Sequence, residues 1–105
     1  MADFNRVYGF HALHGRGIGN AVGIKMSNHK LKVIVIAGDG DTYGEGLNHF
    51  LSCIRGNHDV TLIIHDNQVY GLTTGQGSPT TASHTKTKTA PLGIIDSPVN
   101  PIALA

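Results

Sequence analysis

Polar side chains follow two apolar segments of the sequence, and their chemistry suits a cation. Asp39 and Asp41 come directly after the apolar run Val33–Ala37, and Asp66 and Asn67 follow a second apolar run. Carboxylate and amide oxygens are ligands that Mg²⁺ accepts, usually with water or phosphate oxygens completing an octahedral shell. In open α/β sheets, ligands bind beyond the carboxyl ends of the strands. The sequence therefore predicts one cation site where the two turns meet.

The segments around these turns predict a strand, a helix and a second strand. Leu31–Ala37 and Val60–His65 are rich in β-branched residues, which indicates buried parallel strands. Gly44–Ile54 predicts an amphipathic helix, because its apolar residues recur at positions i, i+3, i+4 and i+7. The three elements form a βαβ unit with a right-handed crossover. Since parallel strands lie about 4.8 Å apart, residues just beyond both strands can reach one ion.

The remaining segments predict one more helix and two loops. Gly17–Ser27 has helical spacing, and its glycines favour close packing against a partner surface. Residues 1–15 show no clear period and predict a loop. From Tyr70 onward, Gly, Ser, Thr and Pro dominate, which predicts loop with one short helical turn. At 105 residues, the chain is expected to form a single domain over residues 1–105.

Composition argues against several classes of protein. The net charge of +1, without a basic cluster, argues against binding to nucleic acid. No apolar run approaches the roughly 18 residues of a membrane span, and no signal peptide precedes the first motif, so a cytoplasmic protein without a membrane partner is expected. Cys53 is the only cysteine, which leaves no internal disulfide and no ligand set for an iron–sulfur cluster within this chain. Cys53 itself is expected to be a small buried hydrophobe.

Three ordered motifs carry a resemblance to a known family. The signature Gly38-Asp39-Gly40, followed further along the chain by Asn67, resembles that of thiamine diphosphate enzymes. The longer motifs are HALHGRGIGNAVGIK, GDGDTYGEGLNHF and DNQVYGLTTGQGSPTT. Together they are similar to the beta subunit of the 2-oxoacid:ferredoxin oxidoreductases, the group that includes pyruvate and 2-oxoglutarate oxidoreductases. The similarity covers nearly the whole chain.

The resemblance implies a fold, a cofactor and a set of site residues. The fold is an α/β doubly wound parallel sheet of the thiamine-diphosphate-binding type, expected here to be incomplete because the family has further sequence on both sides of the matched region. The cofactor is thiamine diphosphate held through Mg²⁺, and the implied ligands of the ion are Asp39, the Asn67 side chain and a backbone carbonyl near Val69. The residues implied to contact the cofactor are His14, Gly38, Gly40, Asp41, Gly71 and Leu72.

The function that the resemblance implies is oxidative decarboxylation of a 2-oxoacid, together with other oxidoreductase subunits and ferredoxin. In thiamine enzymes, the glutamate that activates the cofactor comes from a different domain, and Glu45, the only glutamate here, is poorly placed for that role. The isolated chain is therefore expected to be inactive and to associate with itself or with a larger partner. The alternative is a non-catalytic remnant that acts as an interaction or assembly module through exposed sheet edges.

Other interpretations apply to some of the same residues. Asp39 and Asn67 are residue types that commonly cap turns, with no ligand involved. By spacing alone His14 is an ordinary polar residue, and the resemblance is what locates it beside the cofactor. A calcium-binding EF-hand at this turn is excluded, because its twelfth position is Phe50 where a glutamate is needed.

Overall fold

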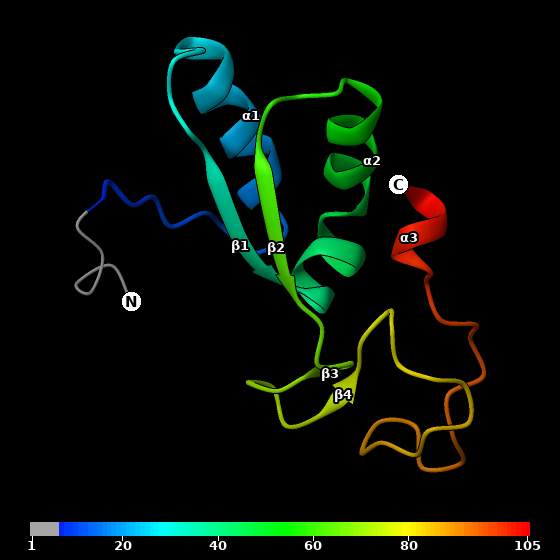
Figure 1. Ribbon diagram of the computed structural model, residues 1–105. Helices are drawn as coiled ribbons and strands as arrows, with labels where there is room; N and C mark the ends of the chain where they lie inside the picture. The colour runs from blue at the N-terminus through cyan, green and yellow to red at the C-terminus, as the bar shows by residue number, and fades with distance from the viewer. Residues whose placement is uncertain (1–6) are drawn as a thin grey trace.

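Two runs of β-branched residues form a small parallel sheet. In the computed structural model, which describes residues 7–105, β1 spans Ile34–Gly38 and β2 spans Thr61–His65. The two strands pair in parallel, with Gly38 opposite His65. Both strands therefore end at the same edge of the sheet, at the lower end of the strands in Figure 1.

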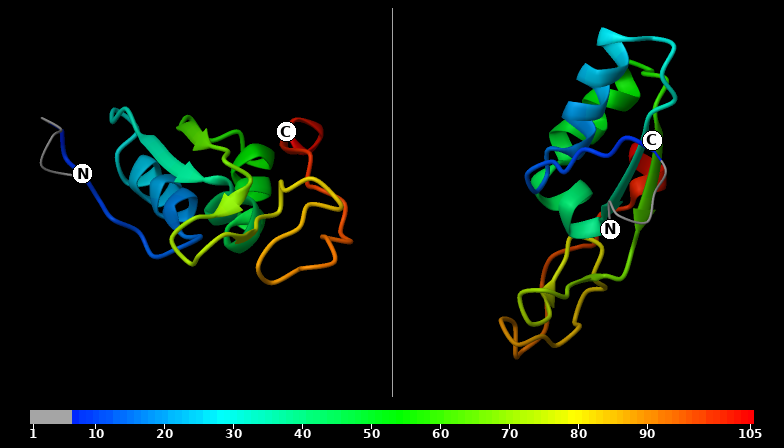
Figure 2. Two further views of the ribbon diagram at one scale, coloured as in Figure 1. Left: turned by 90° about the horizontal axis from the view of Figure 1, so that it is seen from below. Right: turned by 90° about the vertical axis from the view of Figure 1, so that its left-hand side faces the viewer.

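Two helices cover one face of this sheet. α1 spans Gly17–Ser27, as predicted, and α2 spans Leu47–Arg55. Both lie on the same side of the strands, as the right-hand view in Figure 2 shows. An added Cβ on Gly19 would come within 3.3 Å of the His49 ring, so the predicted close packing of a helix glycine is confirmed there. The buried apolar side chains are Ile18, Ala21, Val35, Tyr43, Phe50 and Cys53.

Within the described residues, the strands are buried on one face only, so the prediction of buried strands is confirmed for that face alone. Val35 faces the helices and is 8% exposed, whereas its neighbours Ile34 and Ile36 are 60% and 63% exposed. Ile63 on β2 is 45% exposed. The cause is the alternation of side chains along a strand, because α1 and α2 both pack against the same face. The predicted α/β class with a parallel sheet is confirmed, in a partial form.

The chain leaves β1 through a π-helix and only then enters α2. The π-helix spans Gly40–Glu45, and α2 begins at Leu47, where the sequence predicts a start at Gly44. An added Cβ on Gly40 or Gly44 would collide with the ring or hydroxyl of Tyr70. Close approach of Tyr70 to this segment therefore requires glycine at both positions, and such π-helical turns are frequent at functional sites.

Loops dominate residues 66–105. β3 (Val69–Tyr70) and β4 (Gln76–Gly77) pair in antiparallel fashion, a hairpin that the sequence does not predict. α3 spans Pro101–Leu104 and corresponds to the one short helical turn expected in this region. Asn100 caps α3, because its side-chain oxygen accepts from two backbone N–H groups at 3.1 Å. The loops and the hairpin lie beyond the carboxyl ends of β1 and β2 (Figure 1).

Two predictions include residues 1–6, which lie outside the described residues. The loop predicted over residues 1–15 is found without helix or strand where it is described, from Val7 onward. The single domain predicted over residues 1–105 stays a prediction. Within residues 7–105, no helix has the length and apolar character needed to cross a lipid bilayer.

Candidate functional site

Three turns meet beyond the carboxyl ends of β1 and β2. Gly38 and His65 are partners in the parallel register, so the residues that follow them, Asp39 and Asp66, leave the sheet beside each other. A third turn, Ser78–Thr81, packs against both. It is closed by a backbone bond of 3.1 Å between its ends and by a 2.7 Å bond in which the first N–H donates to the last hydroxyl.

Asp39 is a buried carboxylate held by hydroxyl groups. It is 2% exposed, and its Oδ2 accepts hydrogen bonds from Ser78 Oγ and, at 2.8 Å, from Thr80 Oγ1. Burial alone would raise the pKa of Asp39, but these hydroxyls and the backbone N–H groups of Asp39 and Gly40 outweigh it and lower the pKa below its ordinary value of 3.8. Asp39 is therefore ionised at neutral pH, as a ligand of a divalent cation has to be.

Thr80 links the two strand ends through one hydroxyl group. Its Oγ1 lies 2.8 Å from Asp39 Oδ2 and 2.8 Å from Asp66 Oδ1. The neighbouring Thr81 donates to the Gln68 carbonyl at 2.6 Å. Sequence reasoning gave these threonines no role, and their position in the third motif was the only signal that could have drawn attention to them. The contact of Thr80 with Asp39 spans 41 positions of the chain, which no local pattern reveals.

Asn67 closes the turn that follows β2, as the capping interpretation anticipates. Its Oδ1 accepts from the Val69 N–H at 3.1 Å, and Asp66 Oδ1 accepts from the Gln68 N–H at 3.2 Å. Asn67 is nevertheless exposed, and an amide oxygen carries two acceptor lone pairs. Capping the turn therefore leaves one acceptor position on the same oxygen open to a ligand.

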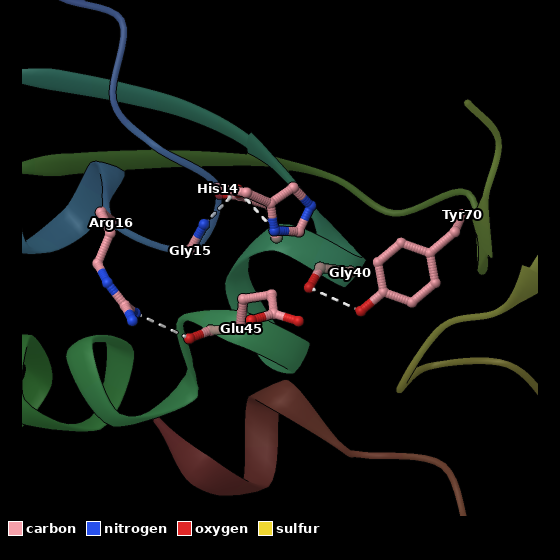
Figure 3. A network of polar contacts seen from close by, with 7 residues as sticks. His14, Gly15, Arg16, Gly40, Glu45 and Tyr70 are labelled. Atoms are coloured by element: carbon pink, nitrogen blue, oxygen red, sulfur yellow. Dashed lines mark hydrogen bonds and ion pairs between the residues drawn. The ribbon is translucent and has the colours of Figure 1, made fainter. Parts of the chain in front are cut away.

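A second polar cluster brings His14 and Tyr70 together beside Gly40 (Figure 3). Asp41 joins it through His14. Asp41 Oδ1 accepts from the Gly15 N–H at 2.7 Å and lies 3.7 Å from His14 Nδ1. Tyr70 donates to the Gly40 carbonyl at 3.1 Å, and its ring centroid lies 6.3 Å from that of His14. The N-terminal loop, the π-helix and the hairpin therefore converge here.

The turn before α1 is fixed against the end of the π-helix. Gly15 has a positive φ of 76°, and an added Cβ would lie 2.7 Å from the backbone carbon of Glu45. Arg16 then donates from its guanidinium to the Glu45 carbonyl at 3.3 Å, as Figure 3 shows. Both contacts use the backbone or Cβ of Glu45, and the residue is exposed. The close approach of the Glu45 backbone therefore explains why the first motif has glycine at Gly15 and arginine at Arg16.

The predicted cofactor-contacting glycines differ in the space around them. An added Cβ on Gly71 would meet no atom within 4 Å, and one on Gly38 would meet a single backbone oxygen at 4.0 Å. The backbone at these two positions is therefore open to a ligand. Gly40 is covered by the Tyr70 ring, and Leu72, at the hairpin, is 100% exposed.

The oxygen groups at the strand ends fit a hard divalent cation. Asp39 supplies an ionised carboxylate, Asn67 an exposed amide oxygen, and the backbone near Val69 a carbonyl, which are the ligand types that Mg²⁺ uses. In the part of the chain that the structure describes, no group of three His, Cys, Asp or Glu side chains could hold a metal. The predicted ligand set differs from such a group, because it combines one carboxylate with an amide oxygen and a backbone carbonyl.

Comparison with known proteins defines the class of the chain. Residues 2–105 match the family described as thiamine pyrophosphate enzyme, C-terminal TPP binding domain. The chain therefore belongs to the thiamine pyrophosphate enzyme family, through its C-terminal cofactor-binding domain.

Individual relatives narrow that class. Over 97% of its length the chain is 54% identical to 2-oxoacid:ferredoxin oxidoreductase 1, subunit beta, of Aeropyrum pernix. Over 93% it is 44% identical to 2-oxoglutarate oxidoreductase subunit KorB of Mycobacterium tuberculosis. The resemblance to these beta subunits that the three motifs predict is thus confirmed. The chain spans 32% and 26% of the length of these two relatives.

A solved structure shares the fold. It is the 2-oxoglutarate:ferredoxin oxidoreductase of Magnetococcus marinus with 2-oxoglutarate, coenzyme A and succinyl-CoA bound. The match has a TM-score of 0.88 and 38% sequence identity, and it covers 91% of this chain and 33% of that one. The two-stranded sheet and its helices are thus part of a larger fold in that protein.

Proposed function

We propose that this chain binds thiamine diphosphate and Mg²⁺ as part of a 2-oxoacid:ferredoxin oxidoreductase that decarboxylates a 2-oxoacid oxidatively. The observation that carries the proposal is the convergence of Asp39 and the Asp66–Asn67 turn at the paired ends of two parallel strands. An ionised carboxylate and an open amide oxygen at this position suit an ion that also holds a diphosphate. Membership of the thiamine pyrophosphate enzyme family supports the same ligand.

Each predicted residue has a task in this proposal. Asp39, the Asn67 amide oxygen and a carbonyl near Val69 hold the ion. The open backbone of Gly38 and Gly71 approaches the diphosphate, since glycine lets a ligand come close to the main chain. The residues assigned to the remaining contacts are His14, Gly40, Asp41 and Leu72. When bound, thiamine diphosphate supplies the chemistry that breaks the bond between the carboxylate and the carbonyl carbon of a 2-oxoacid.

Other subunits provide what these residues do not. Glu45 contacts Arg16 and Gly15 through its backbone and Cβ, which suits a structural role better than contact with the pyrimidine ring of the cofactor. Cys53 is buried, and burial raises the pKa of its thiol, so it is unsuited to ligating a metal. We therefore assign cofactor activation and electron transfer to partner subunits and ferredoxin, in an oligomer located in the cytoplasm.

Thermal unfolding of the chain with added ligands tests the proposal. A ligand present at 100 times its dissociation constant adds about 2.7 kcal/mol to the free energy of unfolding. Thiamine diphosphate with Mg²⁺ is expected to raise the unfolding midpoint, and thiamine diphosphate with EDTA is expected to raise it far less. Thiamine monophosphate is the matched control, because it lacks the second phosphate. No stabilisation by the diphosphate at saturating Mg²⁺ would contradict the proposal.

A non-catalytic interaction module is the second candidate, and the uncovered sheet face favours it. Ile34, Ile36 and Ile63 form an exposed apolar surface, of the kind that marks interfaces. The unfolding experiment separates the two candidates, because a module of this kind gains no stability from the cofactor. Light scattering on the same samples measures whether the chain associates with itself.

A further inference from the structure

Among the residues that the structure describes, the Ser78–Thr81 turn connects the turn after β1 to the turn after β2 through hydrogen bonds of its buried side chains. Ser78, Thr80 and Thr81 are 8%, 7% and 5% exposed. Thr80 reaches both carboxylates, and Thr81 reaches the Gln68 carbonyl on the second turn. The turn is itself anchored from the far side, because the Val99 N–H donates to the Pro79 carbonyl at 2.8 Å.

We propose that Thr80 is a positioning residue, which acts through Asp39 and Asp66 to set the separation and orientation of the two turns that hold the ion. This role rests on the proposed function. It predicts that Thr80 contributes to cofactor binding only when Mg²⁺ is present. Thr80 touches neither the ion nor the cofactor in this account.

The geometry around the Thr80 hydroxyl explains why it is suited to this task. A hydroxyl has one proton to donate and two lone pairs, yet Thr80 Oγ1 lies 2.8 Å from an oxygen of Asp39 and 2.8 Å from an oxygen of Asp66. It can donate to only one of them at a time. With both carboxylates ionised, the second short oxygen–oxygen contact is unfavourable unless positive charge lies close by. A bound cation beside Asp39 supplies that charge, so the arrangement of the three oxygens is matched to a loaded site.

Ser78 supports the same carboxylate without reaching the second turn. Its hydroxyl donates to Asp39 Oδ2 and lies 3.2 Å from Thr80 Oγ1. Removing Ser78 Oγ therefore weakens the hold on Asp39 and leaves the link to Asp66 intact. Removing the Thr80 hydroxyl breaks the link itself, so the two substitutions should differ in their effect.

The test measures the affinity of thiamine diphosphate by titration calorimetry on the full chain, once with Mg²⁺ and once with EDTA. Loss of a group that orients a metal ligand costs about 10- to 100-fold in metal affinity. Thr80→Val is expected to lower the affinity measured with Mg²⁺ by about 10- to 100-fold and to leave the affinity measured with EDTA unchanged. Thr80→Ser keeps the hydroxyl and is expected to restore wild-type binding. Thr85→Val is the matched control, since the exposed Thr85 hydroxyl makes none of these contacts.

The outcomes separate this proposal from the proposed function. Failure of the wild-type chain to bind the cofactor with Mg²⁺ overturns both. Wild-type binding with an unchanged Thr80→Val affinity overturns the positioning role alone. Equal losses of affinity with Mg²⁺ and with EDTA, or no recovery of affinity in Thr80→Ser, would mean that Thr80 has only a structural role. Either result also overturns the positioning role. If Thr80→Val fails to fold, as judged by circular dichroism, Ser78→Ala and Thr80→Ser decide. The role is supported if Ser78→Ala loses less than about tenfold in affinity, with Mg²⁺ only, and Thr80→Ser loses none. Any other pattern contradicts the role.

Discussion

Residues 17–65 and residues 66–105 are built by different interactions. The first region is a βαβ frame in which apolar side chains such as Val35 and Phe50 are buried between helices and sheet. The second has two strands of two residues each and is held mainly by turns and by hydroxyl groups, among them Thr80. Both contribute to the candidate site, because the frame supplies Asp39 and the loops supply the hydroxyl groups that donate to it. We therefore expect stability to depend on the frame, and ligand affinity to depend on the contacts between the frame and the loops.

The largest expected effect is on the frame and concerns stability. Phe50 is 7% exposed and packs edge-on against Tyr43, with ring centroids 5.3 Å apart. Phe50→Ala is expected to lower the free energy of unfolding by about 3 to 5 kcal/mol, because it leaves a cavity in the core. Urea denaturation measures this. Leu51→Ala on the same helix is the control, and since Leu51 is 39% exposed its loss should be much smaller. Equal losses would contradict the assignment of the core.

The second prediction concerns binding. Asp39→Asn removes the one anionic ligand from an ion that also holds a diphosphate, so the affinity for thiamine diphosphate with Mg²⁺ should fall more than about 100-fold, beyond the loss of a supporting group alone. The chain should still fold, with a smaller loss of stability than Phe50→Ala. Calorimetry and denaturation on the same sample measure both quantities. Asp96→Asn, at an exposed loop position, should leave both unchanged. A variant that unfolds instead would mean that Asp39 serves the stability of the frame and not the binding of a ligand.

The third prediction separates a ligand from a turn cap. Asn67→Ala is expected to weaken Mg²⁺-dependent cofactor binding about tenfold, equivalent to about 1.4 kcal/mol. Asn48 on α2 is exposed, and Asn48→Ala is expected to leave binding unchanged. If Asn67→Ala changes only the unfolding midpoint, the capping bond to Val69 is its whole contribution.

The smallest expected effect is a pH dependence confined to the frame. Lys25 Nζ lies 2.6 Å from Asp59 Oδ2, and this hydrogen bond and charge lower the pKa of Asp59 below its ordinary value of 3.8. A carboxyl group with a lowered pKa contributes stability above its unfolded pKa and loses it as pH falls through the folded pKa. The wild type should therefore lose more stability than Asp59→Asn on acidification below about pH 4. Parallel curves for both proteins would show that this exposed pair contributes nothing.

The two regions also differ in how well the sequence predicts them. α1 is found at Gly17–Ser27 as predicted, and the strands end within one residue of their predicted ends, because apolar periodicity records which face of an element is buried. The π-helix is missed, and the contact of its first residue, Gly40, with the Tyr70 ring joins distant parts of the chain, which no local pattern reveals. The hydroxyl contacts of Thr80 are missed for the same reason.

The candidate site was predicted in part. The motifs locate Asp39 and Asn67 correctly at the ends of adjacent strands, because a parallel register makes the two strand ends coincide. The side chains that donate to Asp39 come from the Ser78–Thr81 turn, for which the sequence predicts only a loop. Its position depends on tertiary hydrogen bonds, and local propensity carries no information about them.

Nuclear magnetic resonance with Mn²⁺ in place of Mg²⁺ tests the central claim most directly, since a paramagnetic ion broadens the resonances of nearby nuclei. With thiamine diphosphate and Mn²⁺, the amide resonances of Gly40, Asn67 and Gly71 should broaden first. Those of Asn28 and Lys30, in the segment between the end of α1 and the start of β1, should stay sharp. Asp39→Asn should abolish the selective broadening. Broadening that is strongest away from the three turns, or equal in wild type and Asp39→Asn, would contradict a cation site at the ends of β1 and β2.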